Sequence, residues 1–164
     1  MGQTEKKFDF KPSVKEIVEL KKEMFVERID EIKLMDNFNQ LVSSMYDEGF
    51  PMAVASSNNR KIVNIIIEKF GLEKYMKFVI SGEEVDKGKP DPEIFLTAAK
   101  KMNVKPEDCL VIEDATSGVK AAKAAGMKCI GLKNPDHGNQ DLSEADLIIN
   151  NLNELNLNIM KKLF

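Results

Sequence analysis

The chain has 164 residues, of which 43% are hydrophobic and 31% are charged, a composition typical of a globular domain and not of a disordered or fibrous protein. Its 24 basic and 27 acidic residues give a net charge of −3, so there is no overall basic excess to hold nucleic acid or an anionic membrane. No apolar stretch reaches the roughly 18 residues that span a bilayer, and the N-terminus lacks a secretory signal. We therefore expect a soluble, cytoplasmic protein with no nucleic-acid or membrane partner.

The thiols and the imidazole of this sequence offer little chemistry. Cys109 and Cys129 both lie in apolar runs that are typical of buried strands, where a small thiol is common, and this usage fits a reducing compartment. The single histidine, His137, lies in a turn-rich segment and forms no recognisable motif with a second imidazole or a serine nucleophile. We interpret it as a surface loop residue.

The first part of the chain predicts two helices. From Ser13 onward the apolar residues recur at helical spacing, and Ser13 itself is a residue that caps a helix start. We expect this helix to bury one apolar stripe that includes Ile17, Leu20 and Met24. A second apolar stripe over residues 34–45 predicts the next helix.

Beyond residue 50, short apolar strands alternate with helices, and glycines at 49, 71 and 126 follow three of the helices, where a left-handed stop is favoured. Strand and helix alternating at this interval imply βαβ crossovers. The fold class is therefore α/β, with a doubly wound parallel sheet and helices on both faces. We expect strands at residues 50–57, 77–81, 109–114, 128–132 and 145–150, and helices at 59–70, from 91, at 117–125 and in the tail.

In such sheets ligands bind beyond the carboxyl ends of the strands, so the residues that follow each strand are candidates for the site. Ser56, Ser57, Asn58 and Asn59 follow the first strand and precede a helix. A hydroxyl beside the N–H groups of a helix N-terminus suits an anion such as phosphate. The plainer interpretation is that these four residues only cap the helix.

Two further strand ends carry charge. Lys89 lies between a strand and a helix, and its ammonium can meet a phosphate, whereas the neighbouring Lys87 is interpreted as a solvated lysine. Glu113 and Asp114 end the strand CLVI, where two adjacent carboxylates require a positive partner. Mg²⁺ is the natural candidate because it prefers carboxylate oxygens, and a nearby lysine is the alternative.

The order of hydroxyl, lysine and acid pair resembles the haloacid dehalogenase-like (HAD) superfamily, most closely its β-phosphoglucomutase-like phosphatases and phosphomutases. The segment AVASS is similar to the second family motif, GKPDPEIF to the third and VIEDATSGVKAAKAAGM to the fourth. The helix from Ser13 resembles the end of the family's helical cap. The resemblance implies that residues 1–33 are a remnant of the cap with a linker and that residues 34–164 form a HAD-like core.

The resemblance also implies what the site does. Ser56–Asn58 and Lys89 bind the phosphate of a small phosphorylated metabolite, a sugar phosphate, with Ser56 and Lys89 as the catalytic residues that this chain retains. Glu113 and Asp114 hold Mg²⁺. Full-length relatives transfer the phosphoryl group through an aspartyl phosphate.

The family's first motif, a strand that ends in Asp-x-Asp and supplies the nucleophile, is not found in this sequence. The nearest candidate is Asp9, but Lys11 stands where the second aspartate is needed. Removing a nucleophile typically costs on the order of 10⁴ to 10⁶ in rate. We therefore expect this chain, read as a truncated family member, to be weakly active or inactive by itself.

The missing motif also affects the predicted sheet. In the family that this sequence resembles, the first strand lies between the strands that end here at Ser56 and Glu113. Leaving it out exposes two rows of backbone groups. We expect one of three solutions: residues 5–10 fold into this position, the sheet closes directly, or another chain fills it through self-association.

Two other classes of function stay open beside the enzyme core. The first is a non-catalytic phosphate-binding or interaction module on the same scaffold, which calorimetric titration with phosphate and Mg²⁺ separates from the enzyme. The second, a receiver-type signalling domain, fits poorly, because its acidic pair comes at the first strand and its lysine comes last.

Overall fold

The structure, a computed structural model, describes residues 13–135 and 138–164, and the chain divides into two compact units, Met1–Lys33 and Leu34–Phe164. In the first unit, helix α1 (Val14–Glu27) is followed by the 3₁₀ turn η1 (Ile29–Glu31). The predicted start at Ser13 is confirmed by a capping box, in which the Glu16 carboxylate accepts from the Ser13 N–H at 2.7 Å.

Within its own unit, the apolar stripe of α1 is exposed at Ile17, Leu20 and Met24. The burial of this stripe against another element stays a prediction. The stripe pattern fixes which residues share one side of the helix, but not whether another element covers that side. Within the described residues, no helix is both long enough and apolar enough to cross a membrane.

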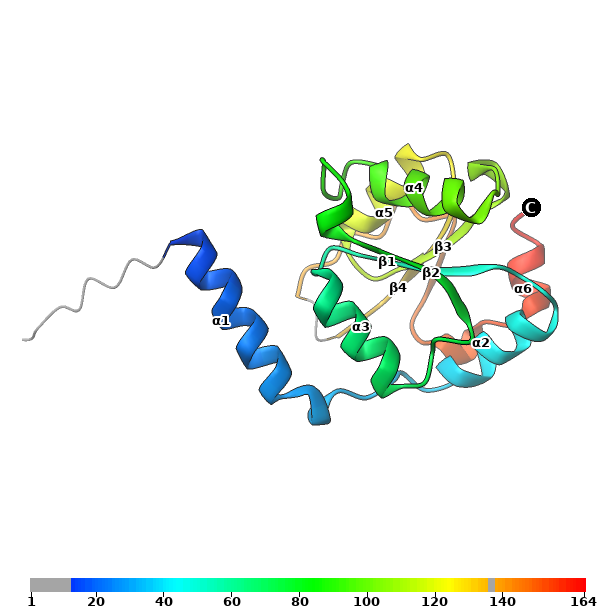
Figure 1. Ribbon diagram of the computed structural model, residues 1–164. Coiled ribbons are helices and arrows are strands. Elements are labelled where there is room, and N and C mark those ends of the chain that lie inside the picture. The colour runs from blue at the N-terminus through cyan, green and yellow to red at the C-terminus, as the bar shows by residue number, and fades with distance from the viewer. Residues whose placement is uncertain (1–12, 136–137) are drawn as a thin grey trace, which may run out of the picture. The chain divides into compact units, whose positions relative to one another are not determined.

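The second unit contains the predicted alternation of strands and helices (Figure 1). Gly49, Gly71 and Gly126 have positive φ angles of 79°, 61° and 75°, as expected for glycines that end helices. The helices are α2 (Phe38–Asp47), α3 (Arg60–Lys69), α4 (Glu93–Met102), α5 (Thr116–Ala124) and α6 (Leu157–Lys161). The strands are β1 (Met52–Ser56), β2 (Met76–Ser81), β3 (Leu110–Glu113), β4 (Lys128–Leu132) and β5 (Leu147–Ile149), and the 3₁₀ turns are η2 (Gly82–Glu84), η3 (Pro106–Asp108) and η4 (Leu152–Glu154).

All strand pairs are parallel, but the described strands form two sheets, β1–β2 and β3–β4–β5. Helices cover both faces: α4 and α5 lie on one face, and α2 and α3 lie on the other (Figure 1). One core cluster joins α4 and α5 to side chains from both sheets, including Ile80 of β2 and Cys129 of β4. The α/β fold class is confirmed, with the sheet in two parts.

We call the edges of β1 and β3 that lie away from their partners β2 and β4, and that pair with no other described strand, the open junction. Every residue of β1 and β3 is half-buried, although a short continuous apolar run such as that of β1 predicts a strand buried on both faces. The expectation of direct closure is wrong for the described residues, because β1 and β3 do not pair. Residues 5–10 lie outside the described residues, and filling by another chain stays a prediction.

Both cysteines are buried free thiols, as the apolar runs around them predicted. Burial raises the pKa of the Cys129 thiol to about 12, and it also raises the pKa of Cys109. Neither thiol is therefore ionised near neutral pH, which argues against a role as a nucleophile.

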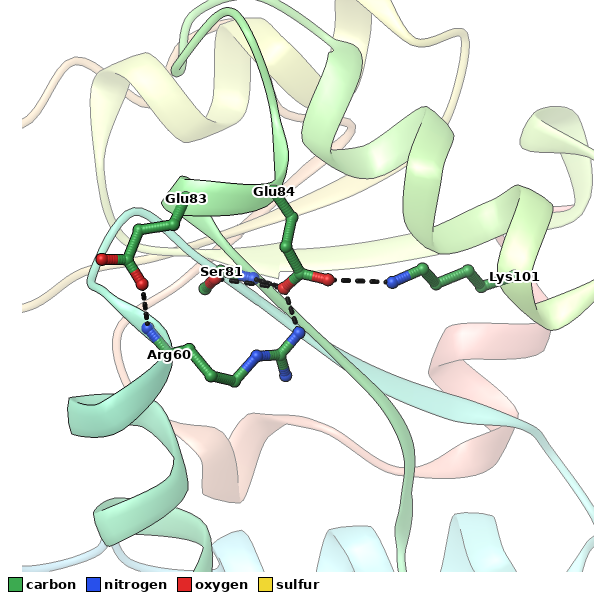
Figure 2. Close-up of polar contacts among 5 residues, drawn as sticks. All are labelled: Arg60, Ser81, Glu83, Glu84 and Lys101. Atoms are coloured by element: carbon green, nitrogen blue, oxygen red, sulfur yellow. Dashed lines mark hydrogen bonds and ion pairs between the residues drawn. The ribbon is translucent and has the colours of Figure 1, made fainter.

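A network of charged side chains ties β2 to α3 and α4 at one end of the first sheet (Figure 2). The Glu84 carboxylate accepts from the Ser81 N–H at 2.8 Å and from the Lys101 ammonium at 3.0 Å, and it forms an ion pair with the Arg60 guanidinium. These contacts, first the Ser81 N–H and then Lys101, hold the pKa of Glu84 at about 2. The charged form of Glu84 is thus the form that stabilises the fold.

We expect the contribution of Glu84 to stability to depend on pH. Its pKa is lowered in the folded state from an ordinary 4.5 to about 2, so the stabilisation is present above pH 4.5 and is lost as the pH falls toward 2. Because the side chain is 29% exposed, we expect only about 1 kcal/mol at neutral pH. Urea unfolding of the wild type and Glu84→Gln at several pH values measures this difference, and a difference that is the same at pH 7 and pH 3 contradicts it.

Candidate functional site

The centre of the candidate site is Lys89, whose ammonium connects the ends of the two sheets. Its Nζ donates to the carbonyl oxygen of Ala55 in β1 at 3.2 Å and forms an ion pair with Oε1 of Glu113, the last residue of β3. The Lys89 side chain is only 8% exposed, and its ammonium lies 4.7 Å from the ring centroid of Phe95. The structure therefore brings together the end of β1, the predicted lysine and one of the two predicted acids.

The loop that carries Lys89 is held by the first residue of α4. The two carboxylate oxygens of Glu93 accept from the N–H groups of Asp86 and Lys87, at 3.0 and 2.9 Å. The Asp91 N–H donates to the Gly88 carbonyl at 3.1 Å, which closes the turn around Lys89. This loop is thus fixed by short-range contacts that involve the backbone, and Lys87 is exposed, as its interpretation as a solvated lysine requires.

Glu113 turns its carboxylate into the protein. Its Oε2 accepts from the N–H groups of Asp114 and Ala115, each at 2.9 Å, while Oε1 faces Lys89. Gly118 in the first turn of α5 leaves room for this carboxylate, because a Cβ at that position would lie 2.0 Å from its carbon. Both oxygens of Glu113 therefore have partners within the protein.

Asp114 lies one residue beyond β3 and contacts the loop that follows β4. Its Oδ2 accepts from Nδ2 of Asn134 at 2.9 Å, and its backbone carbonyl accepts from Nε2 of Gln140. Our sequence reasoning did not single out Asn134 and Gln140. Their position in the loop after another parallel strand is the signal that could have found them, because such loops gather at one edge of the sheet.

A cavity of about 460 Å³ lies beside this edge. Pro90, directly after Lys89, forms part of its wall, and Lys120 supplies a positive charge. The rest of the wall comes from residues 115–117 and 139–140. The cavity is thus next to both the lysine loop and the acid pair.

The predicted phosphate loop begins at Ser56, whose Oγ accepts from the Asn58 N–H at 3.2 Å. Asn59 caps α3, since its Oδ1 accepts from the Ile62 N–H at 3.0 Å. Capping is therefore the role of Asn59, as the plainer interpretation had it. Ser56, Ser57 and Asn58 precede the cap and remain candidates for anion binding.

A serine hydroxyl, a buried lysine and an acid pair at the carboxyl ends of parallel strands define a candidate site for a phosphorylated ligand. Comparison with known proteins agrees with this class. A family model described as haloacid dehalogenase-like hydrolase matches residues 1–132. The chain therefore belongs to the haloacid dehalogenase-like hydrolases, and its relatives support the β-phosphoglucomutase-like subgroup that the motifs predicted.

Three relatives illustrate the similarity. The bifunctional riboflavin kinase/FMN phosphatase of Arabidopsis thaliana is 38% identical over 135 residues, which cover 82% of this chain and 36% of that protein. The β-phosphoglucomutase of Bacillus subtilis is 30% identical over 138 residues, 84% of this chain and 58% of that protein. The crystal structure of CbbY from Rhodobacter sphaeroides in complex with phosphate superimposes with a TM-score of 0.81 at 27% identity, covering 90% of this chain and 68% of that one. The chain thus spans about a third to two thirds of these relatives.

Phosphatases of this family generally use Mg²⁺, and the described residues fit that ion only in part. Across residues 13–135 and 138–164, no group of three His, Cys, Asp or Glu side chains is placed to hold a metal ion. Mg²⁺ commonly takes one or two carboxylates together with waters and substrate phosphate. Of the two predicted ligands, Glu113 has both oxygens engaged within the protein, and Asp114 accepts from Asn134 through Oδ2.

Proposed function

We propose that this chain is the phosphate-binding core of a haloacid dehalogenase-like phosphatase or phosphomutase, and that its ligand is a small phosphorylated metabolite, a sugar phosphate. The observation that carries the proposal is the position of Lys89 between the Ala55 carbonyl and Glu113. A lysine ammonium has three N–H donors. Two are directed to these partners, and we assign the third to a phosphate oxygen.

The phosphate loop supplies the other donors in this proposal. The Ser56 hydroxyl and the Ser57 N–H lie just before α3, whose N-terminal dipole favours an anion. The Asn58 N–H donates to the Ser56 Oγ, which leaves the hydroxyl proton of Ser56 to donate to the phosphate. The relatives that are named as phosphatases, and the CbbY structure that holds phosphate, support this choice of ligand.

Glu113 and Asp114 have different roles in this proposal. Glu113 positions Lys89, because its carboxylate is fixed by two backbone N–H groups and faces the ammonium. Asp114 is the carboxylate that we assign to Mg²⁺, which when bound neutralises charge on the phosphate. The sequence contains no Asp-x-Asp, and Asp9 lies outside the described residues, so we expect little turnover from this chain alone. We also propose a reducing, cytoplasmic location, which the two free cysteines support.

Titration of the purified chain with inorganic phosphate, with and without Mg²⁺, tests the proposal. We expect binding that Ser56→Ala weakens about tenfold, the size expected for one lost hydrogen bond to a charged ligand. Lys87→Ala is the control, because it removes an exposed lysine from the loop that carries Lys89 and should leave the affinity unchanged. A folded chain that binds neither phosphate nor Mg²⁺ contradicts the proposal and favours the non-catalytic interaction module.

A further inference from the structure

The turn that follows β2 packs directly against the proposed phosphate loop. Ser81 at the end of β2 is the register partner of Ser56 at the end of β1. The next residue, Gly82, donates its N–H to the Asn58 carbonyl at 3.1 Å, and a Cβ on Gly82 would lie 2.6 Å from the Ser57 carbonyl oxygen. The turn η2 therefore lies against the backbone of residues 57 and 58.

Two carboxylates of η2 hold Arg60, the first residue of α3 (Figure 2). Oε2 of Glu83 accepts from the Arg60 N–H at 3.0 Å, and Glu84 forms an ion pair with the Arg60 guanidinium. The loop 57–60 is thus contacted by η2 at its middle and at its C-terminal end. The contacts within the loop itself are the Asn58 N–H bond to Ser56 and the cap that Asn59 places on α3.

Glu84 is itself fixed by contacts with two other elements. Its Oε1 accepts from the N–H and the hydroxyl of Ser81, at 2.8 and 3.1 Å, and Ser81 is fully buried. Its Oε2 accepts from Lys101 of α4 at 3.0 Å. Oε1, the oxygen that faces Arg60, is therefore held by Ser81, whereas Lys101 contacts the other oxygen of the carboxylate.

We propose that Glu84 is a positioning residue for phosphate binding: by holding Arg60 against η2, it fixes the backbone N–H of Ser57 and the Ser56 hydroxyl, which accepts from the Asn58 N–H, in the orientation that phosphate requires. This inference rests on the proposed function of the loop. Glu84 lies outside the set of residues that contact the phosphate in that proposal, so its effect on affinity passes through the geometry of the loop. A residue that only stabilises the fold would change the unfolding free energy and leave the phosphate affinity unchanged.

The chain offers a matched pair of variants. Glu84→Gln removes the charge that faces Arg60, whereas Lys101→Met removes the other ion pair of the same carboxylate and leaves the Arg60 contact in place. We expect Glu84→Gln to weaken phosphate binding about tenfold and Lys101→Met to leave it unchanged. Arg60→Met should reproduce the effect of Glu84→Gln, and the double variant should bind no more weakly than either single one.

Phosphate titration calorimetry measures the affinities, thermal unfolding shows that each variant is folded, and amide hydrogen exchange reports the order of the loop. We expect exchange at Asn58 and Arg60 to be faster in Glu84→Gln than in Lys101→Met. If Glu84→Gln binds phosphate as tightly as the wild type, or if Lys101→Met weakens binding as much as Glu84→Gln does, the positioning role is overturned. The proposed function is not affected by either result. A wild-type chain that binds no phosphate overturns the proposed function as well.

Discussion

Replacing Lys89 with methionine should destabilise the fold by about 3 kcal/mol and abolish phosphate binding. The side chains of Lys89 and Glu113 are 8% and 11% exposed, so the substitution leaves a buried carboxylate without its counter-charge. The two backbone N–H groups that bind Glu113 offset only part of this cost. Urea denaturation measures the stability, and titration with inorganic phosphate measures the binding.

A second variant separates the two effects of Lys89. The double substitution Lys89→Met with Glu113→Gln removes the buried charge together with its partner, so it should recover much of the lost stability. It should not recover phosphate binding, because no ammonium is restored. A Lys89→Met chain that is as stable as the wild type would show that the ion pair does not bridge the sheets as described.

The order of helices and strands could be predicted because each depends on local pattern. The run MAVAS is apolar and short, Ser13 caps a helix and Gly71 ends one, and none of these signals needs a distant residue. The convergence of Lys89 and Glu113 could also be predicted, because parallel strands place their carboxyl ends at one edge.

The contacts within the site could not be predicted, because they depend on side-chain directions between segments far apart in sequence. The sequence suggested Mg²⁺ or a nearby lysine beside Glu113, and the structure places Lys89 there. Gly118 leaves space for the Glu113 carboxylate, and this role follows only from the positions of the two residues in the fold. The ion pair between Glu84 and Arg60 joins residues 24 positions apart, and no sequence pattern predicts it.

The pairing of strands at the open junction also could not be predicted from the local sequence pattern. The apolar runs of β1 and β3 predict strands buried on both faces, yet the residues of both strands are half-buried. β1 and β3 each pair along one edge in the described residues, whereas a strand in the interior of a parallel sheet has a partner along both edges. The sequence of a strand does not determine how many neighbouring strands pair with it.

A parallel strand supplied to the open junction and ending in Asp-x-Asp should raise the phosphatase rate of this chain by about 10⁴. The edges of β1 and β3 that no described residue pairs with offer backbone groups to such a strand, and parallel pairing would bring its carboxyl end toward Lys89. The first aspartate would then lie beside the proposed phosphate site as the nucleophile. Fusing an apolar five-residue strand with this ending upstream of residue 13, and measuring hydrolysis of p-nitrophenyl phosphate with Mg²⁺, tests the expectation.

The controls for this fusion distinguish strand pairing from chemistry. Changing the first aspartate of the added strand to asparagine should keep the gain in thermal stability, because the sheet is still completed, and should remove the gain in rate, because the nucleophile is lost. A scrambled strand of the same composition should give neither gain. If the fusion with Asp-x-Asp melts and hydrolyses phosphate ester no differently from the unfused chain, the open junction does not accept a strand, and the edges of β1 and β3 must be satisfied in another way.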